Sequence, residues 1–123
     1  MDLSPYLSRI NYSGDRSTSH DTLRALHLAH VLAVPFENLD GYRGVPVSLE
    51  PADLFAKIVT ARRGGYCFEL NGLFSLLLEA MGFEVTRLIA RVLLVGPGSG
   101  DGVGEVQFRG DGADALLRCL FLG

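Results

Sequence analysis

The chain has 123 residues, of which 48% are hydrophobic and 20% charged. These proportions are typical of one globular domain with a core and exclude a disordered chain. A net charge of −3 gives no electrostatic basis for binding nucleic acid or an anionic membrane. Neither a membrane-spanning run nor a signal peptide is present, so we expect a cytoplasmic protein whose Cys67 and Cys119 remain thiols.

The first third of the sequence predicts two helices. Ser4-Pro5 is typical of an N-cap followed by a first helical residue, and we expect a short helix ending near residue 10. Thr18 and Asp21 have the spacing of a capping box, which predicts a second helix ending near residue 32, before Pro35. The apolar stripe of this helix comprises Leu23, Leu26, His27 and His30.

A connecting segment and a third helix follow. Residues 35–41 mix turn residues with Phe36 and Leu39, which predicts a buried connection. Pro51 is expected at the start of the next helix. The residues that this helix should bury are Leu54, Phe55, Ile58 and Val59.

The pattern changes from helix to strand after residue 82. A helix is predicted over 66–81, with Gly82 as its left-handed stop. Its apolar stripe comprises Leu70, Leu73, Phe74, Leu77 and Met81. Residues 83–95 are β-rich and predict one long strand or two short ones. The glycine-rich stretch 96–112 has no periodicity, so either another strand lies in the apolar residues 115–122 or the sheet is incomplete.

Cys67 is the residue with the clearest chemical potential. Gly64 and Gly65 deliver it to the first turn of the helix, where free N–H groups and the helix dipole favour a thiolate. Such a terminus contributes about 0.3–1 kcal/mol, so a nucleophile also needs a base and an orienting acceptor. The alternative is that Cys67 is a small buried apolar residue. Glu69 and Asn71 follow on the helix at positions that packing alone would give to apolar residues.

Two motifs give the chain a recognisable resemblance. Residues 63–72 (RGGYCFELNG) and 34–39 (VPFENL), together with 90–92 (ARV), resemble the arylamine N-acetyltransferases over about residues 1–95. The resemblance implies an α+β fold, in which a helical bundle leads into an antiparallel β-barrel. It also implies a catalytic triad of the cysteine-protease type. For this chain it implies a helical domain over residues 1–82. Residues 83–123 would be the start of an incomplete β-domain with a divergent or truncated end.

The resemblance also implies a ping-pong reaction. Cys67 would take an acetyl group from acetyl-CoA as cosubstrate and pass it to an arylamine, hydrazine or arylhydroxylamine, with no permanently bound cofactor and no metal. The family draws its triad histidine and aspartate from the β-domain, whereas all three histidines of this chain precede Cys67. We therefore assign neither triad partner nor cofactor-binding residue, and we expect His27 and His30 to be structural.

Glu37 is expected to be partly buried between apolar neighbours and to need a partner. Arg63 is the partner we favour, and the pair would fix the cysteine loop to the helical domain. In the alternative, Glu37 caps a turn and the arginines are solvated. We interpret Arg63, Gly64, Gly65, Glu37 and Asn71 as structural support of the cysteine site.

Three alternatives stay open. The chain could be an inactive remnant that serves as a binding or interaction module, because triad partners are not found. It could be an amide synthase of macrolactam biosynthesis, which shares the cysteine motif. Residues 96–123 could also come from a shifted reading frame, since the pattern is lost after residue 95. With an unfinished β-domain, we expect exposed apolar surface and self-association.

Overall fold

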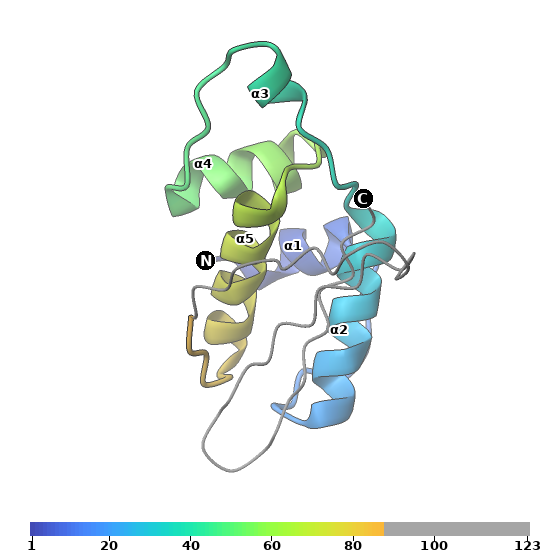
Figure 1. Ribbon diagram of the computed structural model, residues 1–123. Helices are drawn as coiled ribbons and strands as arrows, with labels where there is room; N and C mark the ends of the chain where they lie inside the picture. Colours follow the sequence, from blue (N-terminus) through green and yellow to red (C-terminus); the bar gives the residue numbers. More distant parts are fainter. Residues whose placement is uncertain (88–123) are drawn as a thin grey trace, which may run out of the picture. The chain divides into compact units, whose positions relative to one another are not determined.

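A computed structural model describes residues 1–87 of the chain, and the first of its two compact units is Met1–Phe83. This unit is helical (Figure 1). Its elements are α1 (Leu3–Arg9), α2 (His20–Ala33), α3 (Leu39–Tyr42), α4 (Pro51–Phe55), the π-helical turn η1 (Ala56–Thr60) and α5 (Cys67–Met81). No helix within the described residues is long and apolar enough to cross a membrane.

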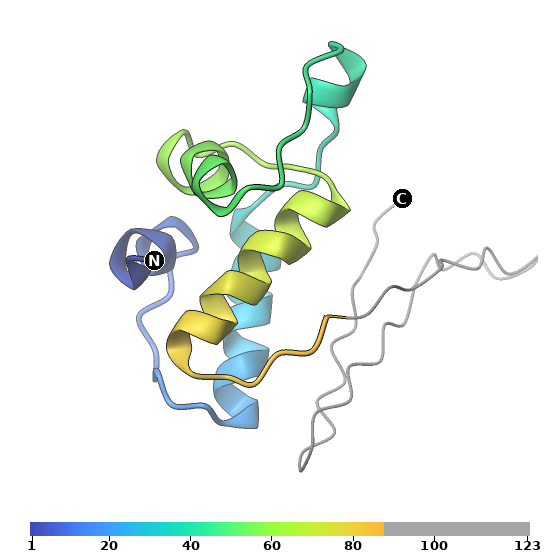
Figure 2. The same ribbon diagram turned by 90° about the vertical axis from the view of Figure 1, so that its left-hand side faces the viewer.

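Helix α5 contacts most of the other helices. α1 and α4 pack against it, and α1 also contacts η1, which continues α4 directly. α2 runs alongside α5 (Figure 2), with the rings of His27 and His30 against Phe74. The buried apolar side chains are Tyr6, Leu7, Ile10, Leu26, Val34, Leu54, Ile58, Val59, Leu73, Phe74, Leu77 and Leu78. The apolar residues predicted for the last three helices therefore supply seven of these twelve side chains: Leu26, Leu54, Ile58, Val59, Leu73, Phe74 and Leu77.

The starts of the first two helices differ from the sequence prediction by one or two residues. Asp2 caps α1, its Oδ1 accepting a hydrogen bond from the Ser4 N–H at 3.1 Å, so the proposed Ser4 cap is wrong. Ser19 rather than Thr18 caps α2, its Oγ accepting from the Thr22 N–H at 3.1 Å. In both places several neighbouring side chains are good caps, and the sequence alone does not choose between them.

The connection after α2 is not buried as expected. Phe36 and Leu39 are 53% and 57% exposed, whereas Val34 and Asp40 are buried. The short helix α3 turns Asp40 inward, where it meets basic side chains, and this leaves the two large apolar residues outside. Burial here follows charge pairing and not hydrophobicity.

Helix α5 agrees with its predicted bounds. It ends at Gly82, whose φ of +99° is in the left-handed region that glycine adopts without strain. Residues 83–87 form no strand, and the rest of the predicted strand, the glycine-rich stretch and the apolar end lie outside the described residues. Within residues 1–87 the β-structure is limited to one parallel bridge between Phe36 and Gly65. The β-domain over 83–123 stays a prediction.

Candidate active site

The loop before α5 fixes the position of Cys67. The Gly65 N–H donates to the Pro35 carbonyl at 3.3 Å, and the Glu37 N–H donates to the Gly65 carbonyl at 2.9 Å. A Cβ on Gly64 would collide with the Pro35 carbonyl oxygen, so this close backbone approach requires glycine. The double glycine therefore holds the loop against the segment that follows α2.

Cys67 itself is the first residue of α5. Its thiol is free and half-buried, and Tyr66, in an extended conformation, is the N-cap residue. The first turn of a helix has N–H groups without intrahelical partners, and these N–H groups favour negative charge nearby. The described structure thus places the sulfur where the sequence predicted it, at a helix N-terminus and partly accessible.

Glu69 caps the same turn from within the helix. Its Oε1 accepts a hydrogen bond from the Tyr66 N–H at 3.2 Å, which is one half of a capping box. Its Oε2 lies 2.7 Å from Nζ of Lys57, and the whole residue is only 3% exposed. Glu69 therefore links the start of α5 to the π-helical turn.

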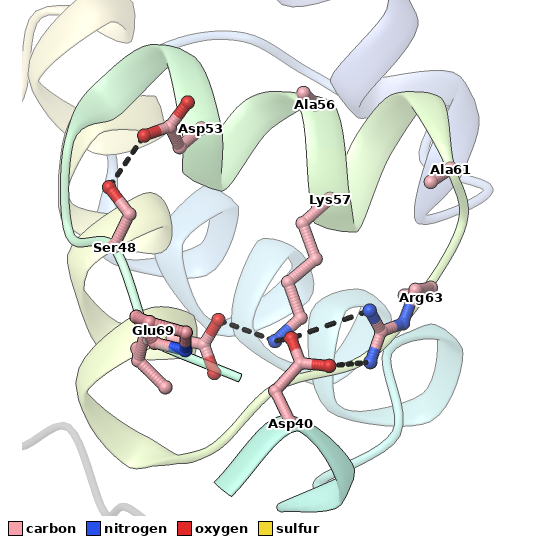
Figure 3. A pocket seen from close by; sticks show the side chains of 10 residues that line it. Asp40, Ser48, Asp53, Ala56, Lys57, Ala61, Arg63 and Glu69 are labelled. Carbon is pink, nitrogen blue, oxygen red and sulfur yellow. Dashed lines mark hydrogen bonds and ion pairs between the residues drawn. The ribbon is translucent and has the colours of Figure 1, made fainter. Parts of the chain in front are cut away.

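Five charged residues form a network beside this turn, which we call the charge network: Glu37, Asp40, Lys57, Arg63 and Glu69. Figure 3 shows the carboxylate of Asp40 between the ammonium group of Lys57 and the guanidinium of Arg63, with Glu69 beside Lys57. Lys57 Nζ lies 2.7 Å from Asp40 Oδ2, and an Arg63 nitrogen lies 2.8 Å from Asp40 Oδ1. Four members of the network, all except Glu37, line a pocket together with apolar and polar residues of the 46–61 region.

The contacts set the charges in the network. Hydrogen bonds from Arg63 and then Lys57 lower the pKa of Asp40 from 3.8 to about 2, against the effect of burial. Burial lowers the pKa of Lys57, but its bonds to Asp40 and Glu69 outweigh that and leave the pKa above its ordinary value. Both groups are therefore charged at neutral pH.

Both interpretations of Glu37 describe part of its environment. One oxygen accepts from the Leu39 N–H at 2.7 Å, which is the turn cap of the alternative interpretation. The other lies 3.5 Å from Arg63, so the favoured pair is present as a longer contact. Arg63 lies closer to Asp40 than to Glu37. Neither Asp40 nor Lys57 was predicted from the sequence to take part in this site. The feature of the sequence that distinguishes Lys57 is that it is the only lysine of the chain.

Arg9 is a third residue whose role was not predicted from the sequence. Its buried guanidinium donates to the carbonyls of Ile58 and Ala33 at 2.8 Å each, and to those of Arg62 and Arg63 at 3.3 and 3.4 Å. Arg9 thus ties α1 to the end of α2, to η1 and to the approach to Cys67. Arg62 has a φ of +55°, an uncommon conformation, and its carbonyl accepts one of these hydrogen bonds from Arg9.

The two histidines of the α2 stripe are packed away from the cysteine turn. His30 is 5% exposed; its Nδ1 lies 3.1 Å from the Tyr6 hydroxyl, and its ring lies 5.0 Å from that of Phe74. Burial, with smaller contributions from His27 and Arg9, lowers the pKa of His30 to about 4. Phe74 is seven residues after Cys67, about 10 Å along the helix axis. Both rings are placed as structural groups, as expected.

Asn71, the remaining residue predicted to support the site, is exposed one turn after Cys67, whereas Arg63 and the double glycine form the cysteine loop and Glu37 contacts it. Within residues 1–87, no group of three or more histidine, cysteine, aspartate or glutamate side chains could hold a metal ion. The described structure itself shows a thiol at a capped helix terminus.

Comparison with known proteins identifies the class. A family model described as N-acetyltransferase matches residues 19–102. An arylamine N-acetyltransferase of Escherichia coli is 48% identical over 95 residues, which are 77% of this chain and 34% of that protein. The chain therefore belongs to the arylamine N-acetyltransferase family. It spans about a third of the length of the curated relatives it matches.

Solved structures show the same relationship. The arylamine N-acetyltransferase of M. smegmatis aligns with a TM-score of 0.69 and 42% identity, covering 96% of this chain and 39% of that one. The enzyme of Mycobacterium marinum in complex with CoA aligns with a TM-score of 0.64 and 50% identity, covering 66% and 30%. The helical unit is thus similar to part of these larger structures.

Proposed function

We propose that this chain provides the acyl-accepting part of an acetyl-CoA-dependent arylamine N-acetyltransferase, with Cys67 as the nucleophile. The observation that carries the proposal is the position of Cys67 at the start of α5, in a loop fixed by the Phe36–Gly65 bridge and capped by Glu69. The family membership and a CoA-bound neighbour support the choice of cosubstrate.

The proposed reaction has two steps. The Cys67 thiolate attacks the thioester carbonyl of acetyl-CoA, forming acetyl-Cys67 while the CoA sulfur leaves and takes up a proton. An aromatic amine, a hydrazine or an arylhydroxylamine then attacks acetyl-Cys67; it gains the acetyl group and loses a proton, and the cysteine thiol is regenerated. Each step exchanges one acyl bond for another, so no oxidant or metal is needed.

The remaining residues have supporting roles in this proposal. Gly64 and Gly65 allow the close backbone approach, Arg63 and Glu37 hold the loop, and Asn71 supports the exposed side of the first turns. His27 and His30 take no part, because they pack in the helix interface. The protein would act in the cytosol, where its thiols stay reduced.

Acetyl-CoA alone tests the first step. After incubation of the full chain with acetyl-CoA, we expect one acetyl group on the peptide that contains Cys67, and release of an equivalent of free CoA. Cys67→Ala should abolish the label, while Cys119→Ala should keep it. The proposal is refuted if wild-type Cys67 stays unmodified or if Cys67→Ala acquires the same label. Adding an aromatic amine should then remove the acetyl group; a macrolactam-type amide synthase would differ in the acceptor it uses.

A second candidate function, an interaction module, is favoured by one observation. Large apolar side chains are exposed on two helices, with Leu28 and Leu32 of α2 at 59% and 78% and Phe68 of α5 at 64%. Such residues are typical of surfaces that pack against other protein. Light scattering tests it: self-association that Leu32→Ser weakens would support this function, and a monomer at every concentration would contradict it.

A further inference from the structure

Lys57 has an environment that the proposed reaction does not yet explain. It is the only lysine among the 123 residues, and its side chain is 15% exposed. Its ammonium group lies between two carboxylates, 2.7 Å from Asp40 Oδ2 and 2.7 Å from Glu69 Oε2. It extends from η1, a π-helical turn, and such turns are frequent at functional sites.

The two oxygens of Glu69 have different partners. Oε2 pairs with Lys57, and Oε1 accepts from the Tyr66 N–H directly before Cys67. The ion pair with Lys57 therefore fixes the plane of the carboxylate in the orientation that the cap requires. A carboxylate that is 3% exposed and has lost its cation is costly, so without Lys57 it would turn toward water and away from the Tyr66 N–H.

The same pair sets the net charge of the first turn of α5. Glu69 lies two residues after Cys67 in the same helical turn, where an uncompensated negative charge disfavours a thiolate. Lys57 offsets that charge directly. Arg63 is bound to Asp40 and Glu37 instead, and its charge acts on Glu69 only at longer range.

We propose that Lys57 is a positioning residue for Cys67, holding Glu69 in its capping geometry and offsetting the charge of that carboxylate in the helical turn that begins with Cys67. This inference rests on the proposed function, because it assumes that Cys67 reacts as a thiolate. It adds a residue outside the cysteine motif to the machinery that prepares the nucleophile.

The test is the pH dependence of Cys67 alkylation by iodoacetamide, with peptide mapping to separate Cys67 from Cys119. Lys57→Met should move the midpoint of the profile upward by about one pH unit and slow the reaction at neutral pH about tenfold. Lys57→Arg, which keeps the charge and a donor, should restore most of the wild-type profile. Arg24→Met, which removes an exposed positive charge from α2, should leave it unchanged.

The controls separate positioning from folding. In concentrated guanidinium chloride all variants should react at one rate, and circular dichroism should show which variants are folded. If Lys57→Met is unfolded, Lys57→Gln carries the same expectation, because it replaces the ammonium group with a neutral amide donor. A folded Lys57 variant without the charge whose profile superimposes on that of the wild type would overturn the inference. Wild-type Cys67 reacting no faster than free cysteine at any pH would instead refute the proposed function.

Discussion

Burial of His30 predicts a specific dependence of stability on pH. The pKa of His30 is lowered from 6.5 to about 4, first by burial and then by His27 and Arg9. Because the folded pKa is the lower one, the unfolded chain binds more protons between these values. The stability that neutral His30 contributes is present above pH 6.5 and is lost as pH falls toward 4. At about 1.4 kcal/mol per pKa unit, the loss between pH 7 and about pH 4.5 is about 2 kcal/mol.

The structure explains why protonation is unfavourable. The His30 ring lies between the Tyr6 hydroxyl and the ring of Phe74, and its Nε2 has no hydrogen-bond partner among the described residues. A proton there would place a charge in an apolar interface without an acceptor. The same geometry makes His30 unsuitable as the imidazolium partner of a thiolate.

Urea unfolding followed by circular dichroism at a series of pH values measures the effect. Between pH 7 and about pH 4.5, the free energy of unfolding of the wild type should fall by about 2 kcal/mol more than that of His30→Asn, because the variant cannot titrate at this position. The absolute stability of the variant does not matter, since only its change with pH is compared. His20→Asn, at an exposed position on the same helix, should keep the wild-type slope. Parallel curves for wild type and His30→Asn would show that His30 is not held neutral in the core.

Three further predictions concern the cysteine loop and its supports. Gly64→Ala should lower the free energy of unfolding, measured in urea, by about 1–3 kcal/mol, because the added Cβ meets the Pro35 carbonyl. Gly72→Ala, inside α5, should be neutral or stabilising, because its Cβ makes only an ordinary van der Waals contact with Leu54. Arg9→Met should lower the free energy of unfolding by about 3 kcal/mol, since four carbonyls lose a charged donor. A loss below about 1 kcal/mol would contradict the role of Arg9 in tying these segments together. Asp40→Asn should lower the melting temperature at neutral pH, and the difference should disappear as pH falls from about 4 through 2, since the folded pKa of Asp40 is the lower one.

Long apolar stripes and glycine stops made the helical core predictable. For α5, the stripe and Gly82 gave bounds within one residue of those observed, and Leu73, Phe74 and Leu77 are buried as expected. α2 was predicted from its stripe, from Pro35 and from a capping box at Thr18, and the observed cap is displaced by one residue to Ser19. Periodicity reports which face is buried, but it does not report which of several polar residues caps the end.

The partners of the charged residues could not be predicted in the same way. Asp40 and Lys57 are 17 positions apart in the sequence, and each alone has the pattern of an exposed charge. Their burial follows from α3 and η1, neither of which has a periodic sequence signal, because one is a single turn and the other a π-helical variation of a predicted helix. Arg9 is similar, since its acceptors are backbone carbonyls, which have no sequence signature.

The two motifs that resemble the family are parts of one structural unit. The carbonyl of Pro35 and the N–H of Glu37, from the first motif, bond to Gly65 of the second, and the close approach leaves no room for a side chain at Gly64. The side chains of the same two motifs meet again where Arg63 contacts Glu37, and Arg63 lies closer still to Asp40, the residue directly after the first motif. A change in either motif would therefore move the backbone that presents Cys67. Their joint occurrence in a sequence is thus explained by the geometry of one loop, whether or not each residue touches a substrate.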